Sequence, residues 1–256
     1  MSPVTATVIT LNEAANIDAC LESLAWADER LVVDSHSTDD TVARAEARGA
    51  RVIVRDWPGY AAQKNFAASQ AAHDWILSVD ADERVTPELA AEIRAVVPSP
   101  GDVAGYRIPR VTWHLGRWIR TTDWYPDPQL RLYDRRRADW PARRVHESVR
   151  ARGPVGRLRH ELQHYAYRDV AHHLETMERY TTLAAEQMYD EGRRARAVDP
   201  AIHQWAAFLR NYVLKRGFLD GGAGYLISRM NARYVAMKFE KLRQLQHAAP
   251  GRTATG

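Results

Sequence analysis

The sequence predicts an α/β fold built around a mostly parallel sheet. In the first hundred residues, short apolar runs typical of strands alternate with segments whose apolar residues recur at helical spacing. Polar and acidic clusters follow two of these runs, at Asp34–Asp39 and Asp80–Glu83. A βαβα series predicts parallel strands joined by right-handed crossovers, and ligands of such sheets bind at the carboxyl ends of the strands.

Each expected strand is an apolar or β-branched run with polar residues at its ends. In chain order the strands are Thr5–Thr10, Leu31–Val33, Arg51–Arg55 and Trp75–Val79. The expected helices between and after them are Ile17–Leu24, a helix from the N-cap-rich cluster 34–39 to Arg48 that Gly49 ends, an alanine-rich helix at Tyr60–Ala72, and a helix opened by Thr86-Pro87-Glu88.

Composition is that of a globular protein. Of 256 residues, 45% are hydrophobic and 27% are charged. The single cysteine, Cys20, excludes an intramolecular disulfide and a cysteine-rich metal site. A net charge of +4 and a pI near 9.3 indicate an anionic partner. Because we find neither a signal peptide nor an apolar run of about 20 residues, we expect a cytoplasmic protein.

Two aspartates mark the expected site. Asp80 and Asp82 follow the Trp75–Val79 strand and, on extended backbone, would point the same way. Such a pair suits a Mg²⁺ ion that is also coordinated by the diphosphate of a ligand. The alternative is an ordinary acidic turn at the end of a strand, which would have the same sequence. The turn from Thr10 to Glu13 lacks glycine, which excludes the dinucleotide fingerprint. A phosphatase with an Asp-x-Asp nucleophile is an alternative, disfavoured by Arg84 and by the motif's place after the fourth strand.

Residues 101–168 interleave tryptophans with arginines. These are Trp113, Trp118, Trp124 and Trp140, with Arg117, Arg120, Arg131, Arg135, Arg136 and Arg137. Aromatic faces pack on sugar rings, and arginines bind phosphate or carboxylate groups. The mixture predicts a phosphorylated saccharide or RNA as ligand. Because no known nucleic-acid motif accompanies it, we expect no nucleic-acid partner.

From Asp169 onward the sequence predicts helices. Apolar residues recur on one face of a helix up to Glu191, and Asp199-Pro200 opens a second helix. The second helix is basic and rich in aromatic residues from Trp205 to Arg216. A helix of this kind either packs on the rest of the protein or lies in a membrane interface.

Several ordered blocks resemble the family 2 glycosyltransferases of the GT-A fold. They are Ala6–Glu13, Val33–Asp39, Gly59–Asn65, Asp80–Glu83, Trp124–Asp127, Arg131-Leu132, Val145–Glu147 and Gly217–Gly221. Within this family the blocks are similar to the lipopolysaccharide inner-core β-1,4-glucosyltransferases of Gram-negative bacteria. His36 departs from the pattern, since relatives often have an aromatic residue such as Phe there.

The resemblance implies a domain organisation and a set of partners. Residues 1–168 would form the GT-A catalytic domain, with a nucleotide-sugar half at 1–100 and an acceptor half at 101–168, and residues 169–256 a C-terminal helical extension. The donor would be a UDP-sugar, with glucose as the sugar in the related subgroup. The acceptor would be a glycolipid or oligosaccharide such as a heptose of the lipopolysaccharide core. Peripheral contact with the inner membrane is also implied.

The resemblance also implies roles for individual residues. Those expected at the nucleotide-sugar are Thr10, Asn12, Glu13, Asp34, Lys64 and Asp80. The alternatives are a helix N-cap for Asn12, a solvated turn acid for Asp34 and an exposed lysine for Lys64. A divalent metal, Mg or Mn, would be bound by Asp82 and by a late histidine, for which His164 fits best. Glu147 is the favoured catalytic base, with Asp127 as the alternative.

Overall fold

The structure is a computed structural model that describes residues 2–141, 148–167 and 170–248. The chain forms two compact units, Met1–Thr112 with Pro126–Ala166, and Trp113–Tyr125 with Tyr167–Gly256. We call them the sheet unit and the helical unit and describe each by itself. Trp113–Tyr125, expected in the first domain, belongs to the helical unit.

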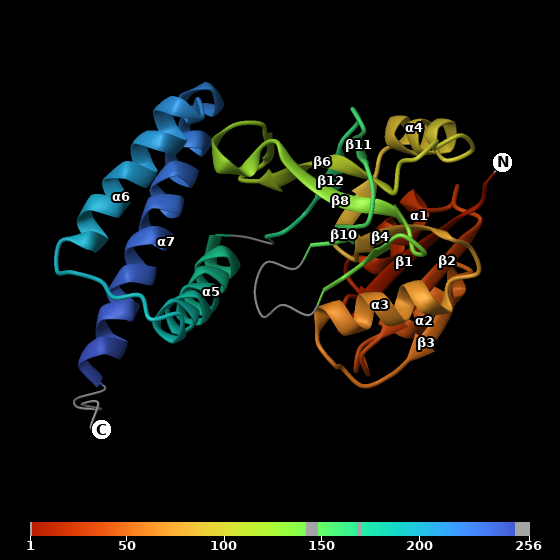
Figure 1. Cartoon of the computed structure of the whole chain (residues 1–256), viewed down its shortest axis with the longest axis horizontal. Helices are drawn as coiled ribbons and strands as arrows, with labels where there is room; N and C mark the ends of the chain where they lie inside the picture. Colours follow the sequence, from red (N-terminus) through yellow and green to blue (C-terminus); the bar gives the residue numbers. More distant parts are fainter. Residues whose placement is uncertain (1, 142–147, 168–169, 249–256) are drawn as a thin grey trace. The chain divides into compact units, whose positions relative to one another are not determined.

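The sheet has a parallel and a mixed half (Figure 1). The parallel strands are, in spatial order, β3 (Arg51–Val54), β2 (Glu29–Asp34), β1 (Val4–Thr10) and β4 (Trp75–Asp80). The order continues with β8 (Asp127–Asp134), β6 (Gly105–His114), β12 (Leu162–His164) and β5 (Glu83–Val85). β8 is antiparallel to both β4 and β6, and β5 is antiparallel to β12.

The expectation of a mostly parallel sheet is therefore correct only for the first half. That half follows the alternation of strands and helices, which forces crossover connections. β6 and β8 follow without a long helix between them, so they pair antiparallel. β11 (Val155–Arg157) also joins β6, while β9 (Ala138–Asp139) and β10 (Arg150–Ala151) form a separate pair.

Helices cover both faces of the sheet in this unit. They are α1 (Ile17–Ser23), α2 (Thr41–Ala47), α3 (Tyr60–Gln70) and α4 (Pro87–Val96), each at its expected place. Because side chains alternate along a strand, Leu77 packs with α1 and α4 whereas Ile76 packs with α3. Thr86 caps α4 as expected, since its hydroxyl accepts the Leu89 N–H at 3.2 Å.

Cys20 lies on the buried side of α1, fully enclosed by this core. Burial raises the pKa of its thiol far above the usual range, so the thiol stays protonated. A thiol in this state packs as a small apolar group and is chemically inert.

The helical unit consists mainly of three helices that lie side by side (Figure 1): α5 (Val170–Asp190), α6 (Asp199–Leu209) and α7 (Gly221–Ala248). A π-helical turn η2 (Arg210–Leu214) and a 3₁₀ turn η3 (Gly217–Asp220) join α6 to α7, and β7 (Arg117–Ile119) and η1 (Thr122–Trp124) complete the unit. Within the described residues no helix has the length and apolarity needed to cross a membrane.

Candidate active site at the carboxyl ends of the strands

Asp34 is a buried anchor at the end of β2. Its carboxylate accepts hydrogen bonds from the Thr10 hydroxyl at 2.9 Å and from the Ser37 backbone N–H at 2.8 Å and hydroxyl at 2.5 Å. The residue is fully buried, so the alternative of a solvated turn acid is wrong. These bonds fix the loop after β2 against the end of β1.

Asn12 joins the same two loops from the other side. Its side-chain oxygen accepts the Thr38 N–H at 2.8 Å, and its own N–H donates to the Ser37 hydroxyl at 2.8 Å. The backbone of Asn12 has φ of 56°, a left-handed conformation that asparagine tolerates well. Since α1 begins only at Ile17, with Asn16 at the N-cap position, the N-cap alternative for Asn12 is wrong.

Glu13 follows in the loop and is half-buried. Its N–H donates to the Thr41 hydroxyl at 2.8 Å, and its carboxylate accepts from the Asn16 side chain at 2.9 Å. Burial raises the pKa of Glu13, with a smaller contribution of the same sign from the charge of Asp82. The loops after β1 and β2 thus form one hydrogen-bonded polar wall.

Asp80, the last residue of β4, is held by two cations. Its carboxylate lies 2.8 Å from Lys64 Nζ of α3 and 2.5 Å from Arg131 Nη2 of β8. Burial alone would raise the pKa of Asp80, but these positive charges outweigh it and keep the pKa well below its usual range. Lys64 is buried, so the alternative of an exposed lysine is wrong; burial lowers its pKa.

Glu83 and Arg131 complete this network, and neither was predicted as part of it. Glu83 is fully buried; its carboxylate lies 3.0 Å from Arg131 Nη2 and 3.1 Å from Arg110 Nη1, and it accepts the Asp80 N–H at 2.9 Å. Arg131 was expected among acceptor-binding arginines. The sequence nevertheless held a signal for its role in the network. Arg131 lies within the apolar strand sequence Leu130-Arg131-Leu132-Tyr133, and a cation buried in such a strand needs a buried acid as partner.

Asp82 and His164 are brought together by strand pairing. β4 ends at Asp80, so Asp82 lies in the turn before β5, and the expectation that both aspartates share an extended strand is wrong. β12 runs antiparallel to β5 with His164 opposite Glu83, which places His164 Nε2 3.4 Å from the Asp82 carboxylate. Burial would raise the pKa of Asp82, but the bond to His164 outweighs it and lowers the pKa.

Asp82 and His164 suit a metal ion whose remaining ligands come from a bound diphosphate and water. In the described part of the chain, no group of three or more His, Cys, Asp or Glu side chains is arranged to hold a metal. Mg²⁺ in phosphate-transfer sites takes only one or two carboxylates, because phosphate oxygens and water supply the other ligands. Asp82 offers one carboxylate, and His164 offers Nε2 while its Nδ1 faces the Thr112 hydroxyl at 3.5 Å.

Of the two candidate bases, the structure describes only Asp127. Both oxygens of Asp127 are engaged: one with Arg110 Nη2 at 2.6 Å and Nε at 3.0 Å, the other with Gln129 at 2.6 Å. The Asp127 carboxylate would first have to break its contacts with Arg110 before it could accept a proton. Glu147 lies outside the described residues.

Comparisons with known proteins give the family. A model described as "Glycosyl transferase family 2" matches residues 5–157. The chain is 29% identical over 257 residues to the "Lipopolysaccharide core biosynthesis glycosyltransferase LpsC" of Rhizobium meliloti (strain 1021), covering 98% of this chain and 95% of that protein. It is 31% identical over 255 residues to an "Uncharacterized glycosyltransferase" of Rickettsia bellii (strain RML369-C), covering 94% and 86%.

Among solved structures, a glucosyl-3-phosphoglycerate synthase from Mycobacterium tuberculosis, in complex with Mn²⁺, UDP and glucosyl-3-phosphoglycerate, is 23% identical with a TM-score of 0.38. The match spans 45% of each chain, less than half of that structure, and carries no argument about this site. The family match and the α/β sheet confirm the predicted fold, which is that of the GT-A enzymes. The chain belongs to glycosyl transferase family 2.

Proposed function

We propose that the protein transfers glucose from UDP-glucose, with inversion, to a hydroxyl of a heptose in the lipopolysaccharide inner core. One observation is the main support for placing the donor site at this edge of the sheet. Strand register pairs Thr10 with Asp34 and Ile9 with Asp80, so the loops after β1, β2 and β4 start at one edge of the sheet. Polar side chains converge at this edge, where ligands of such sheets bind, and this supports a nucleotide-diphosphate site.

In this proposal the wall formed by the loops after β1 and β2 takes the uracil and ribose. Thr10, Asn12, Glu13 and Asp34 supply hydrogen-bonding groups. Thr10 is bonded to Asp34, while Asn12 and Glu13 are held by Thr38 and Thr41 of the loop after β2 and the start of α2. Asp80 faces the ribose, oriented by Lys64 and Arg131. Arg131 Nε and Nη1 are buried and have no hydrogen-bond partner among the described residues.

Asp82 and His164 would hold Mg²⁺ or Mn²⁺ together with the diphosphate. A bound metal ion supplies positive charge that stabilises the departing UDP. The negative charge of Asp82, favoured by its lowered pKa, is what such an ion needs from the protein.

The acceptor hydroxyl must lose its proton as it attacks the anomeric carbon from the face opposite to UDP, which inverts the configuration. A carboxylate within hydrogen-bond reach is the expected base. We assign this role to Glu147 and a positioning role to Asp127, because Arg110 and Gln129 already engage both carboxylate oxygens of Asp127.

The acceptor assignment is supported by the relative of 29% identity, whose name places it in lipopolysaccharide core biosynthesis. A core sugar on its lipid anchor lies at a membrane surface, so the enzyme would work in the cytoplasm in peripheral contact with the inner membrane.

Two measurements test the proposal. Titration calorimetry with UDP should give binding that strengthens on addition of Mn²⁺ or Mg²⁺. Incubation with UDP-glucose and a deacylated, heptose-containing core oligosaccharide should add one hexose by mass spectrometry, with the β configuration by NMR. No metal-dependent UDP binding would refute the donor site, and UDP binding without transfer to any heptose acceptor would refute the acceptor alone.

A further inference from the structure

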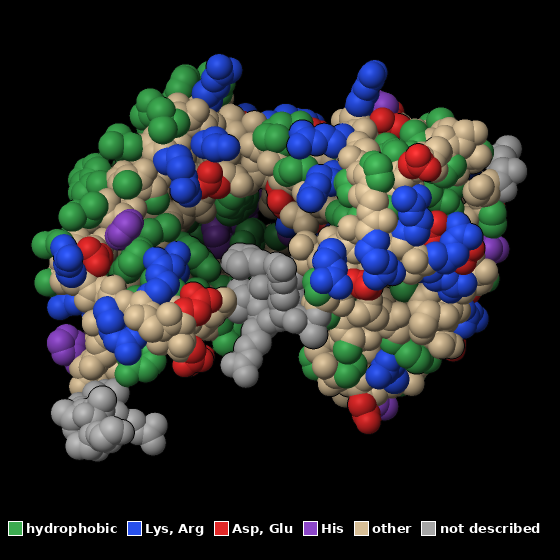
Figure 2. Space-filling view, viewed as in Figure 1, with side chains coloured by type: hydrophobic (Ala, Val, Ile, Leu, Met, Phe, Trp, Pro, Cys, Tyr) green, Lys and Arg blue, Asp and Glu red, His purple; other side chains and the backbone are tan. Residues whose placement is uncertain are grey.

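The helical unit exposes an apolar stripe that runs from the N-cap residue of α6 along α6 and η2. Its members, each more than half exposed, are Val198, Ile202, Trp205, Leu209, Val213 and Leu214. Steps of three or four residues place most of them on one side of the helix. Figure 2 shows hydrophobic side chains gathered along the outer margin of this unit. We call these six residues the α6 stripe.

The stripe lies in a strongly basic segment. Residues 193–219 contain six arginines and lysines but only one acidic residue, Asp199. Lys215 and Arg216 are exposed at the end of the stripe, as is Arg210, which pairs with Asp123. An exposed apolar face flanked by cations is the pattern of a helix that lies in the interface of an anionic membrane.

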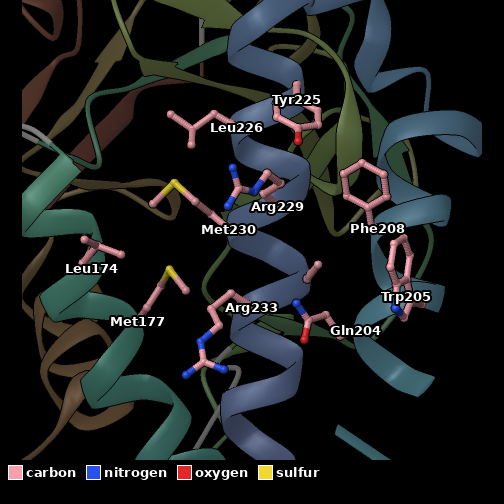
Figure 3. Close-up of a pocket in the computed structure, with 11 residues that line it drawn as sticks. Leu174, Met177, Gln204, Trp205, Phe208, Tyr225, Leu226, Arg229, Met230 and Arg233 are labelled. Atoms are coloured by element: carbon pink, nitrogen blue, oxygen red, sulfur yellow. The ribbon is translucent and has the colours of Figure 1, made fainter. Parts of the chain in front are cut away.

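A cavity of about 620 Å³ opens beside the stripe, between α5, α6 and α7. Its lining is mostly apolar: Leu174 and Met177 come from α5, and Trp205 and Phe208 from α6. Figure 3 shows these side chains on either side of α7. Trp205 belongs both to the cavity and to the stripe, so the two features are continuous.

Two arginines of α7 add a polar element to this apolar lining. Arg229 and Arg233 lie one helical turn apart at the cavity (Figure 3). Arg233 pairs with Glu240 at 2.8 Å, but both side chains are at least 40% exposed, and an exposed pair holds its arginine only weakly. Two guanidinium groups near an apolar cavity match a molecule with a phosphate at one end and a hydrocarbon chain at the other.

We propose that the α6 stripe inserts into an anionic bilayer surface and that the cavity takes an acyl chain of one anionic phospholipid, whose phosphate Arg229 and Arg233 bind. This inference deepens the membrane contact of the proposed function and rests on it. Self-association through the stripe is disfavoured, because it would bring together two segments with six basic residues each.

Vesicle co-sedimentation tests the inference with the full-length protein. Binding should be strong to vesicles that contain phosphatidylglycerol and weak to pure phosphatidylcholine, and it should fall at high salt because surface charges are screened. Trp205→Ser with Leu209→Ser should weaken partitioning about tenfold or more, since two side chains lose their apolar environment. Arg229→Gln with Arg233→Gln should weaken binding to the anionic vesicles about tenfold and change binding to neutral vesicles little.

Matched controls lie in the sheet unit. Trp57 is 45% exposed, and Arg157 is an exposed arginine of β11. Trp57→Ser and Arg157→Gln should bind vesicles like the wild type, and circular dichroism should show all variants folded.

Three outcomes would overturn the inference: equal binding to neutral and anionic vesicles, no effect of either double variant, or a wild-type dimer that Trp205→Ser converts to a monomer in sedimentation velocity. UDP calorimetry on the same wild-type sample separates this inference from the proposed function. Vesicle binding without UDP binding would refute only the function, and UDP binding without vesicle binding only the lipid site.

Discussion

Replacing Arg131 by methionine tests whether the buried ion network holds the sheet unit together. Arg131 Nη2 contacts both Asp80 and Glu83, and the arginine side chain is only 5% exposed. Methionine fills part of the same volume but leaves both carboxylates without this cation. The expected result is a large loss of stability and not merely a loss of ligand binding.

The size of the stability loss depends on which cation each carboxylate still contacts in the variant. Asp80, whose side chain is 31% exposed, retains Lys64, and Glu83, with no exposure, retains Arg110. Removing one partner from a buried ion pair costs about 3–5 kcal/mol, because the remaining charge stays desolvated. We expect a loss in this range, mostly from Glu83. The exposed pair of Arg152 and Asp139 is the control: Arg152→Met should cost less than about 1 kcal/mol.

Urea unfolding followed by circular dichroism measures the effect, with separate transitions fitted for the two units. A second substitution, Glu83→Gln, in the Arg131→Met background should restore about 1 kcal/mol or more, since the buried carboxylate that has lost one of its two cations is then uncharged. The pKa of Asp80 is lowered in the folded state, so its stabilisation is present above the ordinary value of 3.8 and is lost as the pH falls below it. A loss below about 1 kcal/mol would refute the reasoning, and a loss that is unchanged at pH 3 would refute the part assigned to Asp80.

Three further predictions concern the acids of the site. Asp82→Asn should weaken metal-dependent UDP binding about tenfold or more in calorimetry, while metal-free binding changes little. Glu147→Gln should keep UDP binding but lose about 10²–10⁴ in turnover, and an active Glu147→Gln beside an inactive Asp127→Asn would reverse our assignment of the base. Glu13→Gln should raise the melting temperature at pH 7, because the raised pKa of Glu13 means that its ionised form costs stability; the gain should vanish below its ordinary pKa of 4.5.

The parallel half of the fold could be predicted because each of its strands is a local apolar run. β4 was expected at Trp75–Val79 and lies at Trp75–Asp80, and α3 was expected at Tyr60–Ala72 and lies at Tyr60–Gln70. The antiparallel pairing of β8 could not be predicted in the same way. A strand's partner is chosen by contacts distant in sequence, which local periodicity does not contain.

In the candidate site, too, local sequence predicts some residues, whereas the role of others depends on contacts distant in sequence. Asp80 and Asp82 were proposed as site residues because they follow an apolar strand. His164 was proposed from the family resemblance, and its Nε2 lies 3.4 Å from the Asp82 carboxylate. Glu83 directly follows Asp82 in the sequence, but its part in the network was not predicted. Its burial depends on Arg110 and Arg131, which arrive from β6 and β8. Tertiary pairing decides whether an acid is a solvated turn residue or the centre of a charge network.

The enclosed position of Cys20 has a practical consequence. Since its thiol is buried and protonated, a thiol-reactive dye reaches it only when α1 separates from the core. In the native protein, the rate of labelling therefore reports how often the sheet unit opens, without any engineered probe. The same inertness allows one new cysteine at an exposed position such as Leu214 to be labelled selectively, so that opening of the core and events at the protein surface can be timed in one sample.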